Sequence, residues 1–227
     1  GTAQTLLNIG IAWRQIARQE NKPELYPNAW KYYQMALDSL SDTSIIRFEV
    51  FNAMGVTYQE KGDFPQAKAM FEKILNLQKK EFGRENEKTA QTWYNLANIA
   101  RSNKQYPEAL LYNDSSLMAL NYDVYAAKKQ NNTNLFSISQ VLAQRIQILW
   151  SDSKTKSNTE KLRQLSLLYE RTDRVFESMV SSISGIKNRL MFKEFAHTTH
   201  EIDIAAKTAL WHIKKKKNLL NEAFLIA

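Results

Sequence analysis

Two stretches of the sequence decide the fold: FNAMGVTYQEKGDFPQA at residues 51–67 and WYNLANIARSNKQYPEA at residues 93–109. They align without gaps at an offset of 42 residues. In each stretch, apolar residues recur at i, i+3 and i+7, which is the period of one face of an α-helix. A polar turn follows, and then a proline, which the first turn of a second helix tolerates because that turn needs no donor from it. Each stretch therefore predicts a helical hairpin.

Small residues lie beside each apolar stripe, at Gly55 and Ala97, and allow the next helix to approach closely. A degenerate copy of the pattern over about residues 4–40 carries Gly10 at the same place. A single hairpin cannot bury its apolar face, so neighbouring hairpins must stack. The aromatic residues on the packing positions are therefore expected in the core: Trp13, Tyr33, Phe51, Tyr58, Phe71 and Trp93.

The second half of the chain keeps helical periodicity but loses the repeat pattern. Apolar spacing predicts helices over 135–150, over about 162–180 and over about 193–216, with breaks at 130–134, 151–159 and near 184–185. One more helix starts at 219–227, and no Gly, Asn or Pro follows its apolar residues to close it. We therefore expect the native chain to continue past Ala227.

The repeat pattern resembles the tetratricopeptide repeat (TPR), in the longer version of kinesin-light-chain-like proteins. The segment FGREN at 82–86 is similar to the inter-repeat loop of that version. The resemblance implies an all-α fold, a right-handed superhelical solenoid of about five helical hairpins. TPR-like repeats are expected within 1–120, at about 4–40, 45–80 and 87–120, and divergent hairpins that continue the solenoid within 121–227.

A second resemblance covers the C-terminal half. The segments LSLLYE at 165–170, IDIAAKTAL at 202–210 and NLLNEAFLIA at 218–227 follow one another in an order similar to the end of the TPR region in CHAT proteins. In these bacterial proteins the repeats precede a caspase-like protease domain. The resemblance implies that the chain is the regulatory arm of such a protease, with its own downstream domain as one partner.

Composition excludes several classes of protein. The sequence has no cysteine, which rules out disulfides, cysteine-based zinc sites and a thiol nucleophile. Six glycines and four prolines in 227 residues are too few for the frequent turns of a β-sandwich or barrel. There is no run of about 18 apolar residues that would predict a membrane span. The start at Gly1 shows no signal-peptide pattern. The compartment stays open, with the cytoplasm favoured and a targeting segment before Gly1 still allowed.

Motifs for catalysis, metals and cofactors are absent from the sequence, so we expect no enzyme, no metal and no cofactor. His197 and His200 stand at i, i+3, but no third ligand accompanies them, and a surface or packing role is preferred. Positive charge gathers after residue 120, where 17 basic residues face 10 acidic ones, and it includes the four lysines of 214–217. Nucleic acid is the less favoured partner, because lysines at a helix C-terminus also complement the helix dipole.

The TPR resemblance places the first helix of each hairpin along a concave groove. It selects Leu7, Ile11, Arg14 and Val56 as inward-pointing residues, together with six candidate binding residues: Asn52, Gln59, Gln91, Tyr94, Asn98 and Arg101. Amides of this kind pair with a peptide backbone, and Arg101 suits a carboxylate. For Asn8 and Asn95, which share one repeat position, a structural hydrogen bond between hairpins is the preferred interpretation.

Three functions follow from these observations. The first is a non-enzymatic scaffold that binds a peptide or protein segment in the groove, as the TPR arm of a CHAT-type protease. The alternatives are a nucleic-acid-binding helical module that uses the basic C-terminal half, and an architectural module that only self-associates. Salt dependence separates the first two, because binding to phosphates weakens linearly with the logarithm of the salt concentration.

Overall fold

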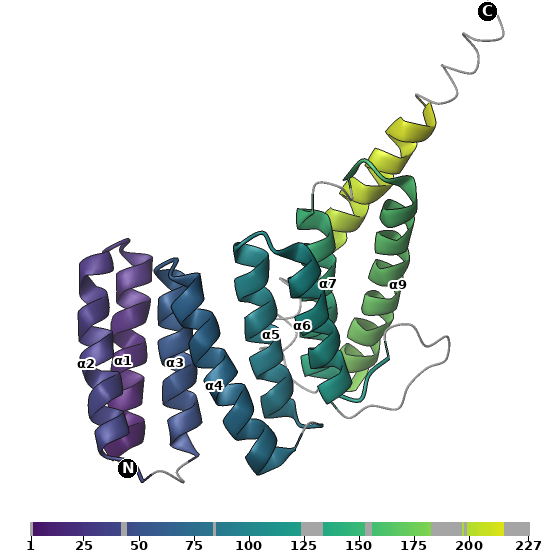
Figure 1. Ribbon diagram of the computed structural model, residues 1–227. Helices are drawn as coiled ribbons and strands as arrows, with labels where there is room; N and C mark the ends of the chain where they lie inside the picture. Colours follow the sequence, from purple (N-terminus) through teal and green to yellow (C-terminus); the bar gives the residue numbers. More distant parts are fainter. Residues whose placement is uncertain are drawn as a thin grey trace, which may run out of the picture. The chain divides into compact units, whose positions relative to one another are not determined.

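The computed structural model describes residues 2–41, 45–83, 85–123, 134–152, 156–182, 197 and 199–215, and all its regular elements in these ranges are helical. They divide into two compact units, 1–99 and 100–227. In the chain order of Figure 1, the helices are α1 (Thr2–Gln19), the 3-10 turn η1 (Pro23–Leu25), α2 (Tyr26–Asp38), α3 (Ile46–Glu60), α4 (Phe64–Phe82), α5 (Glu87–Ser102), α6 (Tyr106–Ala119), α7 (Leu135–Ser151) and α9 (Thr159–Ser182), followed by helix 199–215.

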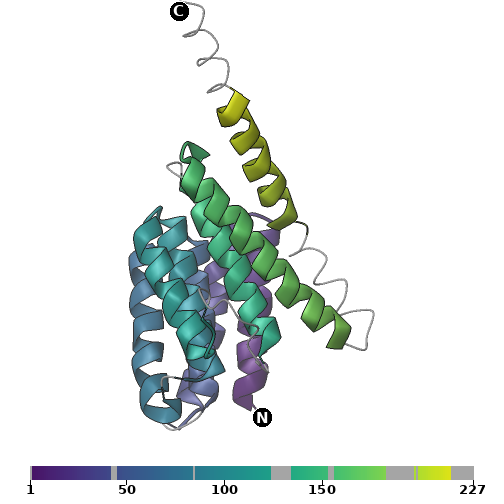
Figure 2. The same cartoon turned by 90° about the vertical axis from the view of Figure 1, so that its right-hand side faces the viewer.

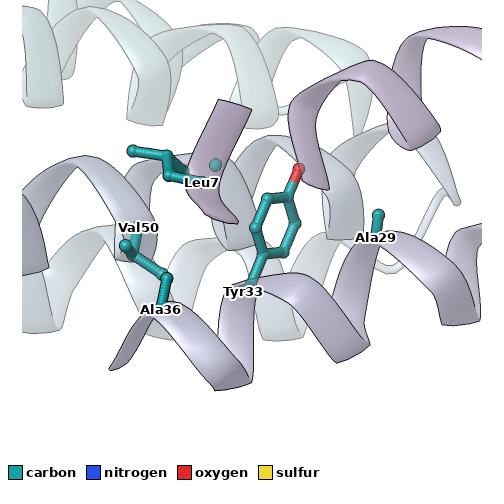
Figure 3. Packing of buried hydrophobic residues seen from close by; sticks show 6 residues of the cluster. Leu7, Ala29, Tyr33, Ala36 and Val50 are labelled. Carbon is teal, nitrogen blue, oxygen red and sulfur yellow. The ribbon is translucent and has the colours of Figure 1, made fainter. Parts of the chain in front are cut away.

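In the first unit, consecutive helices pack as hairpins. Helix α1 packs against α2, and α3 packs against α4 (Figure 1). Helix α3 also contacts both helices of the first hairpin, so the two hairpins stack. A cluster of Leu7, Ala29, Tyr33, Ala36, Val50 and Ala53 fills the space between α1, α2 and α3. Figure 3 shows the ring of Tyr33 standing on α2 within this cluster. The apolar faces of the two hairpins are thus buried against each other.

The predicted aromatic core is only half right. Tyr33, Phe51 and Phe71 are buried, and Tyr33 and Phe71 are not exposed at all. Trp13, Tyr58 and Trp93 are half-buried instead. The ammonium group of Lys79 lies 4.8 Å from the centroid of the Trp93 ring, a cation–π contact that suits a partly exposed indole.

The turns after α3 and after α5 share one backbone conformation. A residue with positive φ stands two positions after the end of α3 and of α5: Gly62 at 78° and Lys104 at 60°. At both turns the next amide reaches back into the helix that has just ended, from Asp63 to the Tyr58 carbonyl at 2.9 Å and from Gln105 to the Ala100 carbonyl at 2.8 Å. These bonds satisfy carbonyls that a helix end leaves unpaired. The repeat therefore extends to the turn, although a lysine replaces the glycine.

Glycines set the spacing within the first two hairpins, as the sequence predicts. A Cβ atom placed on Gly55 would lie 2.8 Å from the ring of Phe71, and one placed on Gly10 would lie 2.5 Å from the ring of Tyr33. Both rings are fully buried, so neither can swing into solvent. A methyl group at either glycine would therefore push the two helices of its hairpin apart.

We expect Gly55→Ala to lower the free energy of unfolding by about 1–2 kcal/mol. Overpacking a filled core costs roughly 1–3 kcal/mol, and the better helix propensity of alanine returns at most about 1 kcal/mol. Urea unfolding followed by circular dichroism measures the change. The exposed α1 residue Gln15 supplies a control, because Gln15→Ala should change stability by less than about 0.5 kcal/mol. A stabilised Gly55→Ala protein would contradict the close approach.

The second unit is held by packing and by buried polar groups. Helix α7 packs against α6 and α9, and Figure 2 shows the long α9 lying along α7. Asn113 of α6 is fully buried and donates to the Val141 carbonyl at 2.8 Å and to Gln144 Oε1 at 2.9 Å, both on α7. It also accepts from Arg145 Nη1 at 3.2 Å, and Arg145 pairs with Asp114. This network fixes the register of α6 against α7.

The last described helix is attached to α9 in the same way. Asp203 is buried, accepts a hydrogen bond from Ser166 of α9 at 2.9 Å and pairs with Lys207 at 2.7 Å. The ion pair raises the pKa of Lys207 above its usual value, with its hydrogen bond to Asp203 as the main cause. Among the described residues, no helix combines the length and the apolar character needed to cross a bilayer.

Candidate functional site

A cavity of about 460 Å³ opens in the first unit, along the first helices of successive hairpins. Its walls come from α1, α3 and α5, with two side chains of α4 at its base. The apolar part of the lining is Leu7, Ile11, Ile45, Phe48, Ala53, Val56 and Ile74. The polar part is Gln4, Asn8, Arg14, Glu49, Asn52, Gln78, Lys88, Gln91 and Thr92. Clefts that combine an apolar surface with a few placed polar groups are the usual form of a binding site.

Side-chain amides on this wall are linked from helix to helix. Asn95 of α5 donates to Asn52 Oδ1 of α3 at 2.8 Å, and Gln91 donates to Asn95 Oδ1 at 3.4 Å. Deeper in the cavity, the hydroxyl of Thr92 donates to Gln78 Oε1 at 2.7 Å. An amide group offers two donors and two acceptor positions. These bonds hold the amides in place and use only part of that capacity.

The preferred interpretation of Asn95 agrees with these bonds, because its bond to Asn52 joins two hairpins. For Asn8 the same expectation stays a prediction. Asn8 accepts from Gln4 of its own helix, at 3.3 Å, on the exposed face of α1. The hairpin before α1 would have to supply the equivalent partner, and α1 is the first described helix of the chain.

An ion pair lies beside the α1 wall of the cavity. Arg14 Nη1 of α1 donates to Glu60 Oε1 of α3 at 2.5 Å, and the two side chains are only 14% and 15% exposed. Arg18 Nη1 lies farther from the same carboxylate, at 3.6 Å, and its side chain is 59% exposed. Burial raises the pKa of the nearby Tyr33 hydroxyl, an effect that a hydrogen bond with Thr57 and the charge of Arg14 partly oppose. The ion pair with Glu60 neutralises the charge of the half-buried Arg14 on this wall.

The structure brings together some of the predicted groove residues and not others. Asn52 and Gln91 line the cavity, as do Leu7, Ile11, Arg14 and Val56. Three candidates, Gln59, Tyr94 and Asn98, are half-buried and do not belong to its lining. The last candidate, Arg101, lies in the second unit, and its Nε atom is buried without a hydrogen-bond partner among the described residues. The role of all six candidates in binding stays a prediction.

Several lining residues were missed by the sequence analysis. Phe48 and Glu49 stand one turn before Asn52 and Ala53 on the same face of α3, so extending the inward stripe by one turn would have found them. Gln78 is harder to find, because it lies on a second helix, which the TPR resemblance places away from the groove. Its signal is a polar residue in the apolar stripe of α4, where Ile74 precedes it by one turn and Gln78 itself is 5% exposed.

The histidines and lysines that the sequence analysis considered do not form a common site among the described residues. His197 lies 3.6 Å from Glu201 in an exposed pair, and His200 Nδ1 lies 3.0 Å from the Tyr169 hydroxyl. Within the described ranges, no three His, Asp or Glu side chains gather in a way that suits a metal ion. Of the lysine run, Lys214 and Lys215 belong to helix 199–215, and Lys215 lies 4.9 Å from the centre of the Trp211 ring. Lys216 and Lys217 lie outside the described residues.

Comparison with known proteins agrees with this architecture. Residues 47–119 match the tetratricopeptide repeat family. The structure is similar to crystal structures of nearly identical TPR-like repeats from a Podosopora anserina chain assigned as a kinesin light chain. The first superposes with a TM-score of 0.57 at 11% identity and covers 98% of both chains. A variant of that protein with a single substitution gives 0.60 at 12% identity and covers 97% of this chain and 93% of the other.

BtubC (BKLC) from P. vanneervenii is similar as well, with a TM-score of 0.56 at 12% identity over 97% of this chain and 91% of that one. A search of curated proteins finds no significant match to the sequence. At these identities the likeness establishes the fold alone, and it confirms the predicted all-α, TPR-like solenoid class. Such repeats generally mediate protein–protein interactions, and the fold is typically a non-catalytic scaffold. Residues 47–119 thus carry the tetratricopeptide repeat signature within a chain that has the TPR-like fold throughout its described part.

Proposed function

We propose that the chain is a non-enzymatic interaction scaffold that binds an extended peptide or protein segment in the cavity along α1, α3 and α5. The observation that carries the proposal is the composition of that cavity. Apolar side chains such as Ile11 and Val56 stand beside amides that are tied to one another, such as Asn52 and Gln91. Apolar surface supplies affinity on burial, and amides pair with the donors and acceptors of an extended backbone.

The fixed amides favour binding for a second reason. Ordering a long polar side chain on binding costs about 0.5–1.5 kcal/mol. Asn52, Asn95 and Gln91 are already held by hydrogen bonds to one another, so much of that cost is met when the unit folds. A guest backbone then meets donors and acceptors whose positions do not depend on its presence. This preorganisation supports a peptide ligand over a compact small molecule, because the amides extend from α3 to α5 rather than converging on one point.

The finer assignment, to the regulatory arm of a CHAT-type protease, rests on the sequence pattern of the C-terminal half. In that assignment, a partner in the groove favours one arrangement of the repeats, and the C-terminal helices pass the change to a downstream protease domain. The native reading frame beyond residue 227 tests it. A His and a Cys in a caspase-like α/β pattern would support it, and a native gene that ends near residue 227 would remove its basis.

Replacing apolar side chains of the cavity lining with serine tests the binding function. We expect Ile11→Ser and Val56→Ser each to weaken binding of a display-selected peptide by about tenfold, because losing the burial of two or more methyl or methylene groups costs roughly 1.4 kcal/mol or more. The matched control is Leu77→Ser, which removes an exposed apolar side chain of α4 that does not line the cavity. Fluorescence anisotropy with the labelled peptide measures each dissociation constant. Equal losses in all three variants would contradict the site.

The same peptide and a single-stranded oligonucleotide separate this function from its first alternative. Nucleic-acid binding would weaken linearly with the logarithm of the salt concentration and would disappear when Lys214 to Lys217 are replaced by Gln. Groove binding would tolerate salt and keep its affinity in that variant. A concentration-dependent mass in analytical ultracentrifugation, together with no ligand in either assay, would favour the architectural alternative.

A further inference from the structure

We propose that Glu60 determines the charge class of the ligand: by neutralising Arg14, it makes the α1–α3–α5 cavity select an uncharged extended segment with an apolar side chain over an acidic segment. This inference rests on the proposed function, because it concerns the same cavity. Glu60 itself stands outside the lining, at the C-terminal end of α3. It acts on a guest through the charge of Arg14, which does belong to the lining.

Arg14 is the least exposed charged side chain of the cavity lining. Its side chain is only 14% exposed. The two other charges of the lining, Glu49 and Lys88, are both exposed and opposite in sign. The Lys88 ammonium group lies 4.9 Å from the centre of the Phe82 ring. Exposed charges are screened by solvent and salt, so they contribute little net field inside the cavity. The charge that a guest meets there is therefore decided at Arg14.

Glu60 removes that charge before a guest arrives. Its carboxylate lies 2.5 Å from Arg14 and is itself 15% exposed, so neither charge is screened as a surface pair would be. The contact is single: Arg14 Nε and Glu60 Oε2 are both buried and have no hydrogen-bond partner among the described residues. A bidentate pair would have used these atoms. The charge of Arg14 is thus compensated through a single contact with Glu60.

An acidic guest would meet a second carboxylate at the same guanidinium. Two like charges in a poorly solvated site repel each other, and each must also lose its hydration. Arg18 does not supply a positive charge for the acidic peptide, because its side chain is 59% exposed and it is absent from the cavity lining. A guest with neutral polar and apolar side chains loses no charge hydration and gains the apolar surface of Ile11, Phe48 and Val56.

The test begins with the wild-type protein and a displayed library of random short peptides. Binders are kept when Ile11→Ser weakens them and Leu77→Ser does not. We expect these peptides to be depleted of Asp and Glu and to bind with little dependence on salt. If no peptide depends on the cavity, the proposed function and this inference both fail. If cavity-dependent peptides are enriched in acidic residues, the function stands and this inference is overturned.

The second arm changes Glu60 itself. A selected neutral peptide and copies with Asp placed at each position in turn are titrated by fluorescence anisotropy. We expect Glu60→Gln to raise the affinity for at least one Asp-carrying copy by tenfold or more, because Arg14 then has an uncompensated charge that attracts the added carboxylate. The gain should fall as salt is added. Glu72→Gln removes an exposed carboxylate of α4 that does not line the cavity and is the matched control, with a change below about threefold.

The double variant Arg14→Gln/Glu60→Gln removes both charges, and we expect it to bind the neutral peptide and to show no gain for acidic copies. Thermal unfolding by circular dichroism checks that each variant folds. If Glu60→Gln does not fold, the wild-type selection and the double variant still decide the matter. An unchanged preference between neutral and acidic copies in a folded Glu60→Gln protein would overturn the inference, and so would an acidic gain that persists in the double variant.

Discussion

Replacing Phe71 with Ala is expected to lower the free energy of unfolding of the first unit by about 3–5 kcal/mol. The ring of Phe71 is fully buried in the α3–α4 hairpin, where it faces Gly55. Its loss leaves a cavity that the two helices cannot fill, because Gly55 offers no side chain. Urea unfolding, followed by tryptophan fluorescence and by circular dichroism, measures the change and tests whether the unit unfolds in one step.

Two further variants separate the loss of this contact from the general effect of shortening a side chain. Leu77→Ala, on the exposed side of α4, should cost less than about 1 kcal/mol, because Leu77 is 40% exposed. Gly55→Ala combined with Phe71→Leu should be more stable than the sum of the two single changes predicts, because the smaller side chain leaves room for the added methyl group. A loss below about 1 kcal/mol for Phe71→Ala, or strict additivity in the double variant, would contradict this packing.

Replacing Asn113 with Ala is expected to destabilise the second unit by about 3 kcal/mol. The change removes the partners of the Val141 carbonyl, Gln144 Oε1 and Arg145 Nη1 at once. Leaving a buried polar group unpaired costs roughly 1–3 kcal/mol, and a charged group costs more. Some of that cost is recovered, because Arg145 keeps its pairing with Asp114.

The matched control is Asn103→Ala, at an exposed turn position where the side-chain amide donates to Gln105 Oε1 at 2.8 Å. We expect it to change stability by less than about 0.5 kcal/mol. Hydrogen exchange of the α6 and α7 amides gives an independent readout, because the loss of Asn113 should expose both helices together. A stability loss equal to that of the control would show that the buried network does not hold α6 to α7.

The repeat could be predicted from the sequence because its signals are local. Helical periodicity, Gly10, Gly55 and the prolines at 65 and 107 each constrain a few neighbouring residues, and the close approach of Gly55 to Phe71 follows from them. The binding site was predicted less well. Asn52 and Gln91 line the cavity, whereas Gln59, Tyr94 and Asn98 do not, because facing inward along a helix does not decide how deep the wall lies at that point.

The ion pair of Arg14 and Glu60 shows where sequence reasoning ends. The two residues stand 46 positions apart and on different hairpins. Arg14 was expected to face the groove, and it does, but its neutralisation depends on how two hairpins stack. The network of Asn113, Gln144 and Arg145 is of the same kind, because a buried asparagine and a surface asparagine look alike in a sequence. Charge and polarity at such sites follow from tertiary contacts.

The most direct measurement for the whole account is photo-crosslinking of a selected peptide that carries a benzophenone side chain, with the attachment sites located by mass spectrometry. The central claim is that the stacked hairpins form a cavity along α1, α3 and α5 that binds a peptide. The account predicts attachment to residues of α1 and α3 such as Ile11, Phe48 and Val56, and loss of attachment in Ile11→Ser. Attachment to helix 199–215 or to α6, unchanged in that variant, would contradict it.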